Sequence, residues 1–324
     1  MSDGPAERAA FAMPSSLLQL PDGSLLVCDT ANNRLCRLCR HPGGGSGGSG
    51  VVVSTVCAKV SWQSPSGLAL LSDGGAGAVL VSDSGHHKLR RIDLATWTVT
   101  NWAGVGKRGH RDGAASGNDG AQFDSPGGLC VCPDGTVLVT DTGNHCLRAV
   151  TTTAHGRRHV RTVAGCPGVR GHRDGAAYVA RFDSPVAVAV TAQGLEGPIY
   201  IADAGSHTLR CVSGAAVPGA AVPGATPRAG GAAQVAAVMA GVAVAGVAVA
   251  GVAVTAVAAA AAGSGAGVAT LAGRPGAAGH RDGALAQSLL HGPAGLCLLP
   301  DGRLLLSDRL SSCLRLLCFG ELVS

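Results

Sequence analysis

The pentapeptide Gly-His-Arg-Asp-Gly occurs three times in this chain, beginning at Gly109, Gly171 and Gly279. Its imidazole, guanidinium and carboxylate groups are able to hold an anion, to bind a peptide or to transfer a proton. Three copies indicate either a binding site assembled from repeated parts or a structural element of a repeating fold. The rest of the sequence shows which elements must position these loops.

The composition favours a turn-rich β protein. The 324 residues include 50 glycines and only 14% are charged, which argues against both a disordered chain and a predominantly helical one. The formal net charge of +5 is small and the basic residues are scattered, so the charge gives little support for a polyanionic partner.

The first residues and the cysteines bear on compartment and cofactors. Residues 1–14 lack a basic stretch followed by an apolar core, so we expect no secretory signal and favour an intracellular location. The twelve cysteines are then expected to be free thiols that fill the core. Cys36 and Cys39 have CxxC spacing, but no second pair of ligands follows at a zinc-finger interval. The sequence therefore predicts no metal ion and no other cofactor.

A longer repeat surrounds the pentapeptides. Five segments share an apolar run that ends in Asp, followed by a short turn. In four of them an Arg follows the Asp by seven residues, whereas Cys36 has this position after Asp29. Because the two side chains flank a tight turn, we expect each pair to form a partly buried ion pair that holds a hairpin, rather than to contact a ligand. The four pairs are Asp83 and Arg90, Asp141 and Arg148, Asp203 and Arg210, and Asp308 and Arg315.

Each repeat is expected to form four short antiparallel strands, named a to d in chain order. In the third repeat they are predicted at residues 128–132, 136–141, 145–150 and 160–165, with turn residues Pro-Asp-Gly and Thr-Gly-Asn between them. A single unit of this kind leaves both of its faces exposed. Units packed side by side around an axis bury them, so the repeat predicts a β-propeller.

The third repeat also carries a family resemblance. The segment FDSPGGLCVCPDGTVLVTDTGNHCLRAV, which begins at Phe123 and follows a Gly-His-Arg-Asp-Gly loop, resembles the NHL repeat. Together with such loops it is similar to the NHL propellers found alone or beside thioredoxin-like domains. The resemblance covers residues 1–212 and 268–319 and implies a single all-β propeller of five four-stranded blades. The blades are expected at about residues 11–58, 62–104, 123–165, 182–212 with 268–273, and 290–319.

The closure of this propeller stays open at the level of sequence. No strand d follows the last repeat, and the first residues offer no replacement. The chain is therefore expected to be either a five-bladed ring with an incomplete last blade or part of a six-bladed propeller. An incomplete blade would leave an exposed strand edge.

Residues 213–267 form a low-complexity insertion of Ala, Val and Gly between strands c and d of the fourth repeat. Its uncharged stretch at 235–262 is long enough to suggest a membrane-spanning helix on hydropathy alone. Such a helix would put two strands of one blade on opposite sides of a membrane. We therefore expect a flexible loop and no membrane span.

The strand directions predict where the candidate binding residues gather. Because strands a to d alternate in direction, the b–c turns and the d-to-a connections emerge at the same end of each blade, and the pentapeptides are d-to-a connections. Two interpretations stay open: the aspartates cap the loops in a purely structural role, or Arg and His of successive blades form a site near the propeller axis. The candidate residues are His110, Arg111, Asp112, His172, Arg173, Asp174, His280, Arg281, Asp282, His87, His145 and His207.

Three functions follow as expectations. The resemblance implies first a non-catalytic scaffold that binds a protein or peptide at this end. An RNA-binding propeller is the first alternative, although aromatic residues make up only 3% of the chain and RNA recognition depends on base stacking. A metal-dependent propeller enzyme related to lyases or hydrolases is the second, although the expected strands a contain no His, carboxylate or Tyr. The oligomeric state cannot be derived from the sequence.

Overall fold

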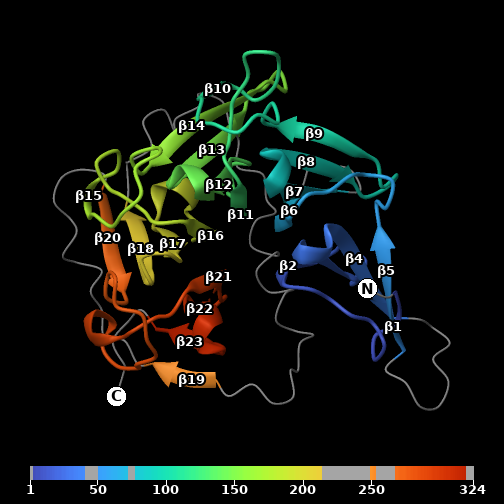
Figure 1. Cartoon of the computed structure of the whole chain (residues 1–324). Helices are drawn as coiled ribbons and strands as arrows, with labels where there is room; N and C mark the ends of the chain where they lie inside the picture. Colours follow the sequence, from blue (N-terminus) through green and yellow to red (C-terminus); the bar gives the residue numbers. More distant parts are fainter. Residues whose placement is uncertain (1–2, 41–49, 72–76, 214–248, 253–266, 319–324) are drawn as a thin grey trace. The chain divides into compact units, whose positions relative to one another are not determined.

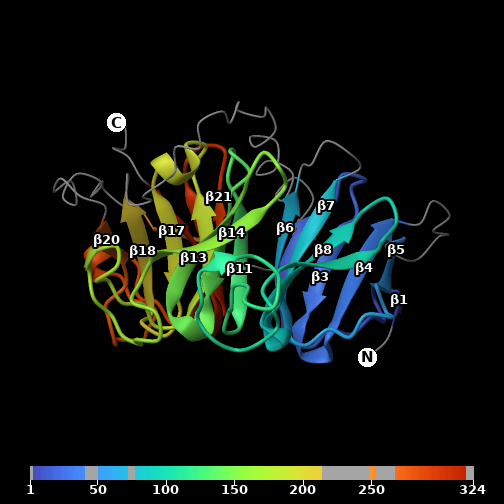
Figure 2. The same ribbon diagram turned by 90° about the horizontal axis from the view of Figure 1, so that it is seen from above.

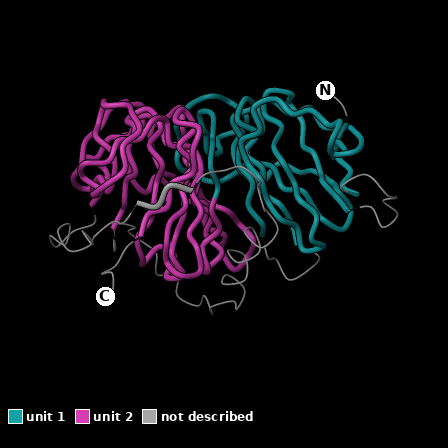
Figure 3. The backbone as a smooth tube through the Cα atoms, turned by 90° about the horizontal axis from the view of Figure 1, so that it is seen from below, with its two compact units in different colours: residues 1–129 teal, residues 130–324 magenta. Residues whose placement is uncertain are grey.

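The computed structural model describes residues 3–40, 50–71, 77–213, 249–252 and 267–318 (Figure 1). The regular elements in these ranges are β-strands and short 3₁₀ turns, so the fold is all-β. Five successive sheets form the blades of a β-propeller fold and are numbered blade 1 to blade 5 in chain order. The chain divides into two compact units, residues 1–129 and 130–324, which are described separately (Figure 3).

Blades 1 and 2 lie in the first unit. Their strands are rich in Leu and Val, and side chains on both faces are buried because each sheet has a neighbour to pack against. Blade 1 has the order β1-β5-β4-β3-β2, with β1 (Gly4–Pro5), β2 (Pro14–Gln19), β3 (Leu25–Asp29), β4 (Arg34–Arg40) and β5 (Val51–Val56). Blade 2 has the order β6-β7-β8-β9, with β6 (Pro65–Leu71), β7 (Ala78–Asp83), β8 (Lys88–Asp93) and β9 (Val99–Ala103).

Blade 3 begins in the first unit and continues in the second. Strand β10 (Gly113–Ala114) lies in the first unit and β11 (Pro126–Val131) runs across the division. The antiparallel strands β12 (Val137–Asp141), β13 (Cys146–Thr152) and β14 (Arg158–Ala164) belong to the second unit. A register shift between Leu147 and Arg148 marks an irregularity in the pairing of β13 with β14.

Blades 4 and 5 complete the second unit (Figure 2). Blade 4 has the order β15-β20-β18-β17-β16, with β15 (Gly175–Ala176), β16 (Pro185–Val190), β17 (Ile199–Asp203), β18 (Thr208–Ser213) and β20 (Gly267–Ala272). Blade 5 has the order β19-β23-β22-β21, with β19 (Val249–Val252), β21 (Pro293–Leu298), β22 (Leu304–Asp308) and β23 (Cys313–Leu317). Because β18 pairs with β20, the two parts of blade 4 join across the insertion.

The short 3₁₀ turns are η1 (Thr30–Asn32), η2 (Ser84–His86), η3 (Thr142–Asn144), η4 (Gly194–Glu196), η5 (Leu285–Gln287) and η6 (Arg309–Ser311). Four of them follow the aspartate that ends strand b and turn the chain into strand c. The residue after each b–c turn has a left-handed backbone with φ between 52° and 57°, in blade 4 as well as in the other blades. Asn and His, which occupy four of these five positions, tolerate this conformation better than most residues. The five positions are Asn33, His87, His145, His207 and Ser312.

The core lies between neighbouring blades. In the first unit, Leu26 and Leu35 of blade 1 share a buried cluster with Val79 and Ile92 of blade 2. In the second unit, Leu138 of blade 3 packs in the same way with residues of blade 4, and blade 4 with blade 5. Within each unit, adjacent blades also contact each other through their first strands, β2 with β6 and β16 with β21. In each of these blades, strands b and c separate strand d from the first strand that makes this contact.

Two features differ from the expectation of four strands per blade. Asp-Gly segments, which begin at Asp3, Asp112, Asp174 and Asp282, precede four of the blades. In blades 1 and 4 they add a short fifth strand outside strand d, because β1 pairs with β5 and β15 pairs with β20. The last blade, for which no strand d was expected, has β19 paired in parallel with β23. Strand β19 comes from the insertion, so this segment is not entirely a loop.

The uncharged stretch at residues 235–262, for which no membrane span was expected, falls almost wholly outside the described residues. In the part of the chain that the structure describes, no helix has the length and apolar character needed to cross a membrane.

Candidate functional site

Each blade contains an arginine on strand c beside the aspartate that ends strand b. This arginine is buried in blades 1, 3, 4 and 5 and partly buried in blade 2. We call these residues the core arginine and the strand-end aspartate. In blades 3, 4 and 5, a core-arginine Nη1 lies 2.7, 3.2 and 3.2 Å from Oδ2 of the strand-end aspartate, and the paired side chains are at most 2% exposed. In blade 2 the Nε of Arg90 lies 2.6 Å from Oδ2 of Asp83. A buried ion pair is tolerated when its remaining polar atoms also find partners.

The strand-end aspartate uses its second oxygen to bind the chain ahead of strand a. Oδ1 accepts the backbone N–H of the residue two positions before the first proline of strand a, as Asp203 does from Asp183 at 2.7 Å and Asp308 from His291 at 2.7 Å. The same bond joins Asp29 to Ala12 and Asp83 to Gln63. Burial raises the pKa of Asp203 to about 7, while Arg210, Ser206 and the Asp183 N–H favour its charged form.

Blade 1 fills the same role with a different residue. Cys36 has the expected position of the core arginine, but Arg34, two residues earlier, donates from Nε to Oδ2 of Asp29 at 2.7 Å. Residues i and i+2 of a strand point to the same face, so an arginine at either position reaches the aspartate. The sequence contained this signal, because Arg34 lies on the same face as Cys36.

The aspartates of the Asp-Gly segments contact the core arginines. Asp174 lies 2.6 Å from Nη2 of Arg210, and it also accepts the backbone N–H and the hydroxyl of Thr270 on β20, each at 3.0 Å. Asp282 lies 2.8 Å from Nη2 of Arg315. In blade 1, Asp3 binds Arg34 and Thr55 in the same way, although this Asp-Gly segment lacks the preceding Gly-His-Arg. Burial alone would raise the pKa of Asp3, but hydrogen bonds from Thr55 and the charge of Arg34 lower it.

The core arginine also closes the loop that carries the pentapeptide. Arg210 donates to the backbone oxygens of Arg173 and Arg181 at 3.0 and 2.9 Å, and these two residues bond to each other through both of their N–H groups. Arg315 binds the backbone oxygens of Arg281 and Leu289 in the same manner. One guanidinium therefore holds the strand-end aspartate, the Asp-Gly aspartate and the loop backbone together.

The histidines of the b–c turns join neighbouring blades. His87 Nδ1 accepts the backbone N–H of Ser125, His145 Nδ1 that of Ser184 and His207 Nδ1 that of Gly292, at 3.0 to 3.1 Å. In blade 1 the side-chain oxygen of Asn33 accepts the N–H of Ser64 at 2.7 Å. Each acceptor therefore binds the residue directly before the first proline of the next blade. An imidazole accepts at Nδ1 only when this nitrogen carries no proton.

Hydroxyl groups at the start of the same turns form a second link between blades. Thr30 and Ser84 donate to the backbone oxygens of Pro65 and Pro126 at 2.7 and 2.6 Å, and Thr142 donates to that of Pro185 at 2.7 Å. These links depend on residues far apart in the sequence.

The remaining candidate residues lie on the surface of the loops. His110, Arg111, Asp112, Arg173, His280 and Arg281 are exposed. His172 is half-buried, with Nε2 2.8 Å from the hydroxyl of Thr270, and burial together with the charge of Arg210 lowers its pKa. In blade 4 the loop leads to β15, at the opposite edge of the sheet from β16. The loop thus reaches the edge of the sheet formed by β15 and β20, opposite strand a of the same blade.

Burial deactivates several of the thiols. All twelve cysteines are free, and burial raises the pKa of Cys36, Cys57, Cys130 and Cys211 to about 11. A thiol with a raised pKa is a poor nucleophile. Among the described residues, no three His, Cys, Asp or Glu side chains cluster so as to hold a metal ion.

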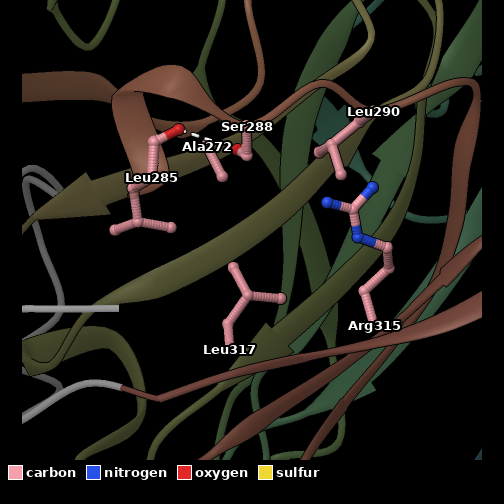
Figure 4. A pocket seen from close by; sticks show the side chains of 6 residues that line it. All are labelled: Ala272, Leu285, Ser288, Leu290, Arg315 and Leu317. Atoms are coloured by element: carbon pink, nitrogen blue, oxygen red, sulfur yellow. Dashed lines mark hydrogen bonds between the residues drawn. The ribbon is translucent and has the colours of Figure 1, made fainter. Parts of the chain in front are cut away.

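A small apolar pocket lies beside Arg315 (Figure 4). Its lining residues come from the end of blade 4, the following loop and β23, and Ser288 donates to the Leu285 oxygen at 2.7 Å within it. Leu290 has the position that Phe182 and Trp62 occupy in other blades, where Arg210 and Arg90 lie 5.1 Å from the ring centres. Leu is smaller than either aromatic side chain. The pocket is therefore explained by packing alone.

Comparisons with known proteins agree with this geometry. The family model of the NHL repeat matches residues 123–149. The chain is similar to the protein SUPPRESSOR OF QUENCHING 1, chloroplastic, of Arabidopsis thaliana, with 29% identity over 157 residues that cover 44% of this chain and 14% of that protein.

Two solved structures share the fold. An auxiliary nutrient binding protein from Bacteroides ovatus superposes with a TM-score of 0.59 at 16% identity, covering 94% of this chain and 59% of that one. A protein of the same description from Bacteroides thetaiotaomicron gives 0.53 at 13% identity, covering 97% and 71%. The chain thus spans less than two thirds of the plant protein and of the first of these structures. Identities this low establish the fold alone.

Proposed function

Because the chain is an NHL-repeat β-propeller protein, we propose that it is a non-catalytic scaffold that binds a protein or peptide at the end formed by the b–c turns and the Gly-His-Arg-Asp-Gly loops. The proposal includes an intracellular location. Within the loops, the exposed His110, Arg111, Arg173, His280 and Arg281 would contact the partner. The aspartates, His172 and the turn histidines would hold these contacts in place.

One observation carries the proposal: exposed basic side chains lie on loops whose backbone is hydrogen-bonded to a core arginine. Arg210 and Arg315 each bind two backbone oxygens of their loop and one Asp-Gly aspartate. A surface loop fixed in this way loses little conformational entropy when a partner binds it. Loops serving only to connect blades would not need an exposed Arg before three of the four Asp-Gly segments.

Affinity purification with the full chain tests this function. The loop variant replaces Arg111, Arg173 and Arg281 by Ala. A control variant replaces Arg40 at the end of β4, Arg157 in a c–d turn and Arg303 in an a–b turn, which are also exposed, so that both variants lose the same charge. We expect at least one protein to be recovered by the wild type and the control variant but lost by the loop variant. Equal recovery by both variants would contradict the proposal, and loss of the partner on RNase treatment would favour the RNA-binding alternative.

A further inference from the structure

The loop of blade 4, residues 170–183, carries two arginines directly opposite each other. The N–H of Arg173 donates to the oxygen of Arg181 at 3.3 Å, and the N–H of Arg181 donates to the oxygen of Arg173 at 3.0 Å. Side chains opposite each other in an antiparallel pair leave the backbone on the same side, with Cβ atoms about 5 Å apart. Both arginines are exposed, so two guanidinium groups extend together into solvent.

The acidic residues of this loop do not neutralise the pair. Asp174 binds Arg210 and Thr270, and Asp183 lies 2.8 Å from Nε of Arg170. Among the described residues, neither Arg173 nor Arg181 has an acidic side chain within ion-pair distance. Like charges placed opposite each other destabilise a pair of strands, so the fold itself gains nothing from this arrangement.

The equivalent positions of the other two pentapeptide loops differ. In the loop that precedes blade 3 they are Arg111 and Gln122, and Arg111 lies 3.4 Å from Asp119. In the loop that precedes blade 5 they are Arg281 and Leu289. The pair of arginines is thus a feature of blade 4 rather than a requirement of the loop.

Exposed apolar side chains lie in the same loop. Tyr178 and Val179 are 50% and 46% exposed, and the Tyr178 hydroxyl lies 3.5 Å from the backbone oxygen of Thr162 on β14. An aromatic side chain near guanidinium groups is the composition that recurs at the centre of protein interfaces.

We infer that the loop of blade 4 binds an acidic segment of a protein partner, whose carboxylates pair with Arg173 and Arg181 while an apolar side chain packs on Tyr178 and Val179. The inference rests on the proposed function and names the partner's chemistry. Guanidinium groups pair with carboxylates through two parallel hydrogen bonds, and two such groups fit adjacent acidic residues. A nucleic acid would instead require a longer basic track with several stacking rings, and this loop has one aromatic side chain in its exposed part.

Fluorescence anisotropy with the full chain tests this inference. The probe is a fluorescein-labelled decapeptide of alternating Glu and Leu, with an alternating Lys and Leu peptide and a twelve-residue oligouridylate as comparisons. We expect the wild-type chain to bind the acidic peptide but neither the basic peptide nor the oligouridylate. The R173A/R181A variant should bind the acidic peptide about tenfold more weakly or worse, because both charge-assisted contacts are lost. The Ala side chains leave the backbone bonds to Arg210 unchanged, which a thermal melt of the variant verifies.

Blade 5 supplies the matched controls. Arg303→Ala removes one exposed arginine from the a–b turn of blade 5, away from the proposed binding end, and should leave the affinity for the acidic peptide unchanged. Leu289→Arg should create a second arginine pair and raise the number of bound peptides from one to two. Unchanged affinity of R173A/R181A, or oligouridylate binding as tight as that of the peptide, would overturn the inference. The proposed function would survive such a result if the loop variant still lost its partner in the purification experiment.

Discussion

Arg210 is the residue on which the polar contacts of blade 4 converge. It pairs with Asp203 and Asp174, binds two backbone oxygens and lies over the ring of Phe182. Asp203 ends β17, and the other partners belong to the loop at residues 170–183. The stability of blade 4 therefore depends on one guanidinium, which pairs with Asp203 within the blade and holds the backbone of the loop outside it.

Replacing Arg210 by Met should therefore destabilise the protein strongly. Loss of one member of a buried pair leaves an uncompensated charge, at a cost of about 3–5 kcal/mol in the free energy of unfolding. Urea unfolding followed by tryptophan fluorescence measures this cost. Arg173→Ala, an exposed arginine of the same blade, is the control and should change the free energy by less than about 0.5 kcal/mol. Similar effects of the two substitutions would mean that Arg210 is not a structural centre.

His207 makes the contact between blades 4 and 5 sensitive to acid. Its Nδ1 accepts the Gly292 N–H, and its ring lies 5.5 Å from that of His291. Burial and the charge of His291 lower its pKa, partly opposed by Asp183 and Asp308. Because the folded pKa is below the ordinary value of about 6.5, this contribution to stability is complete above that pH and is lost as the pH falls through the folded pKa.

The variant His207→Asn tests this dependence, because Asn33 makes the same contact in blade 1 with an acceptor that does not titrate. Asn also tolerates the left-handed backbone at this position. Between pH 7.5 and pH 5, the wild type should lose about 1 kcal/mol more of unfolding free energy than the variant, the value of one hydrogen bond. Chemical denaturation at the two pH values gives the difference. The same loss in both proteins would assign the acid sensitivity to other groups.

At this scale the sequence predicted contacts within a turn better than contacts between blades. The seven-residue spacing of Asp and Arg placed both side chains beside one hairpin, and the structure has them 2.6 to 3.2 Å apart. The partners of Asp174 and of the turn histidines lie 36 to 96 residues away, so no local spacing reports them. Arg34 was missed because the repeat was compared position by position rather than by strand face.

At the scale of the element, the main strands were also predictable from local sequence patterns. In blade 3, apolar runs and turn residues predicted β12, β13 and β14 within a few residues of their observed bounds. The short outer strands β1 and β15 contain only Gly with Pro or Ala, which have low strand propensity. They exist because a neighbouring strand and an Asp-Gly aspartate hold them, and neither factor is visible in a window of sequence.

In blade 4 the residue directly after β20 is Gly273, and its backbone passes close to the b–c turn that contains His207. Gly273 has φ of +83°, and a Cβ there would lie 2.3 Å from the His207 oxygen. Gly276 has φ of +71°, but its Cβ would meet nothing within 4 Å.

The pair of variants Gly273→Ala and Gly276→Ala separates steric conflict from backbone strain. Gly276→Ala should cost about 1 kcal/mol for the left-handed conformation alone. Gly273→Ala should cost at least about twice as much, since the backbone around His207 must also move. Thermal and urea unfolding of both variants give the two values. Equal costs would mean that strand d and the b–c turn adjust to each other without penalty.

At the scale of the whole chain, the insertion is the feature that links distant segments. It interrupts blade 4 between β18 and β20, yet it supplies β19 to blade 5. The insertion contains a five-residue repeat, and an odd repeat length shifts equivalent side chains from one face of a strand to the other. A strand at the edge of a sheet needs only one hydrogen-bonding edge, so β19 can form without a constant buried face.

If β19 covers the edge of blade 5, removing its N–H groups should expose β23. Ala250 and Gly251 pair with Arg315 and Leu316, and successive N–H groups of a strand point to opposite sides. The double substitution by Pro therefore removes the group that faces β23, whichever of the two it is. Hydrogen exchange measured by mass spectrometry should show the amides of Cys313–Leu317 exchanging about tenfold faster or more, with Ile199–Asp203 of blade 4 unchanged. Unaltered exchange in β23 would show that this edge of blade 5 is protected without β19.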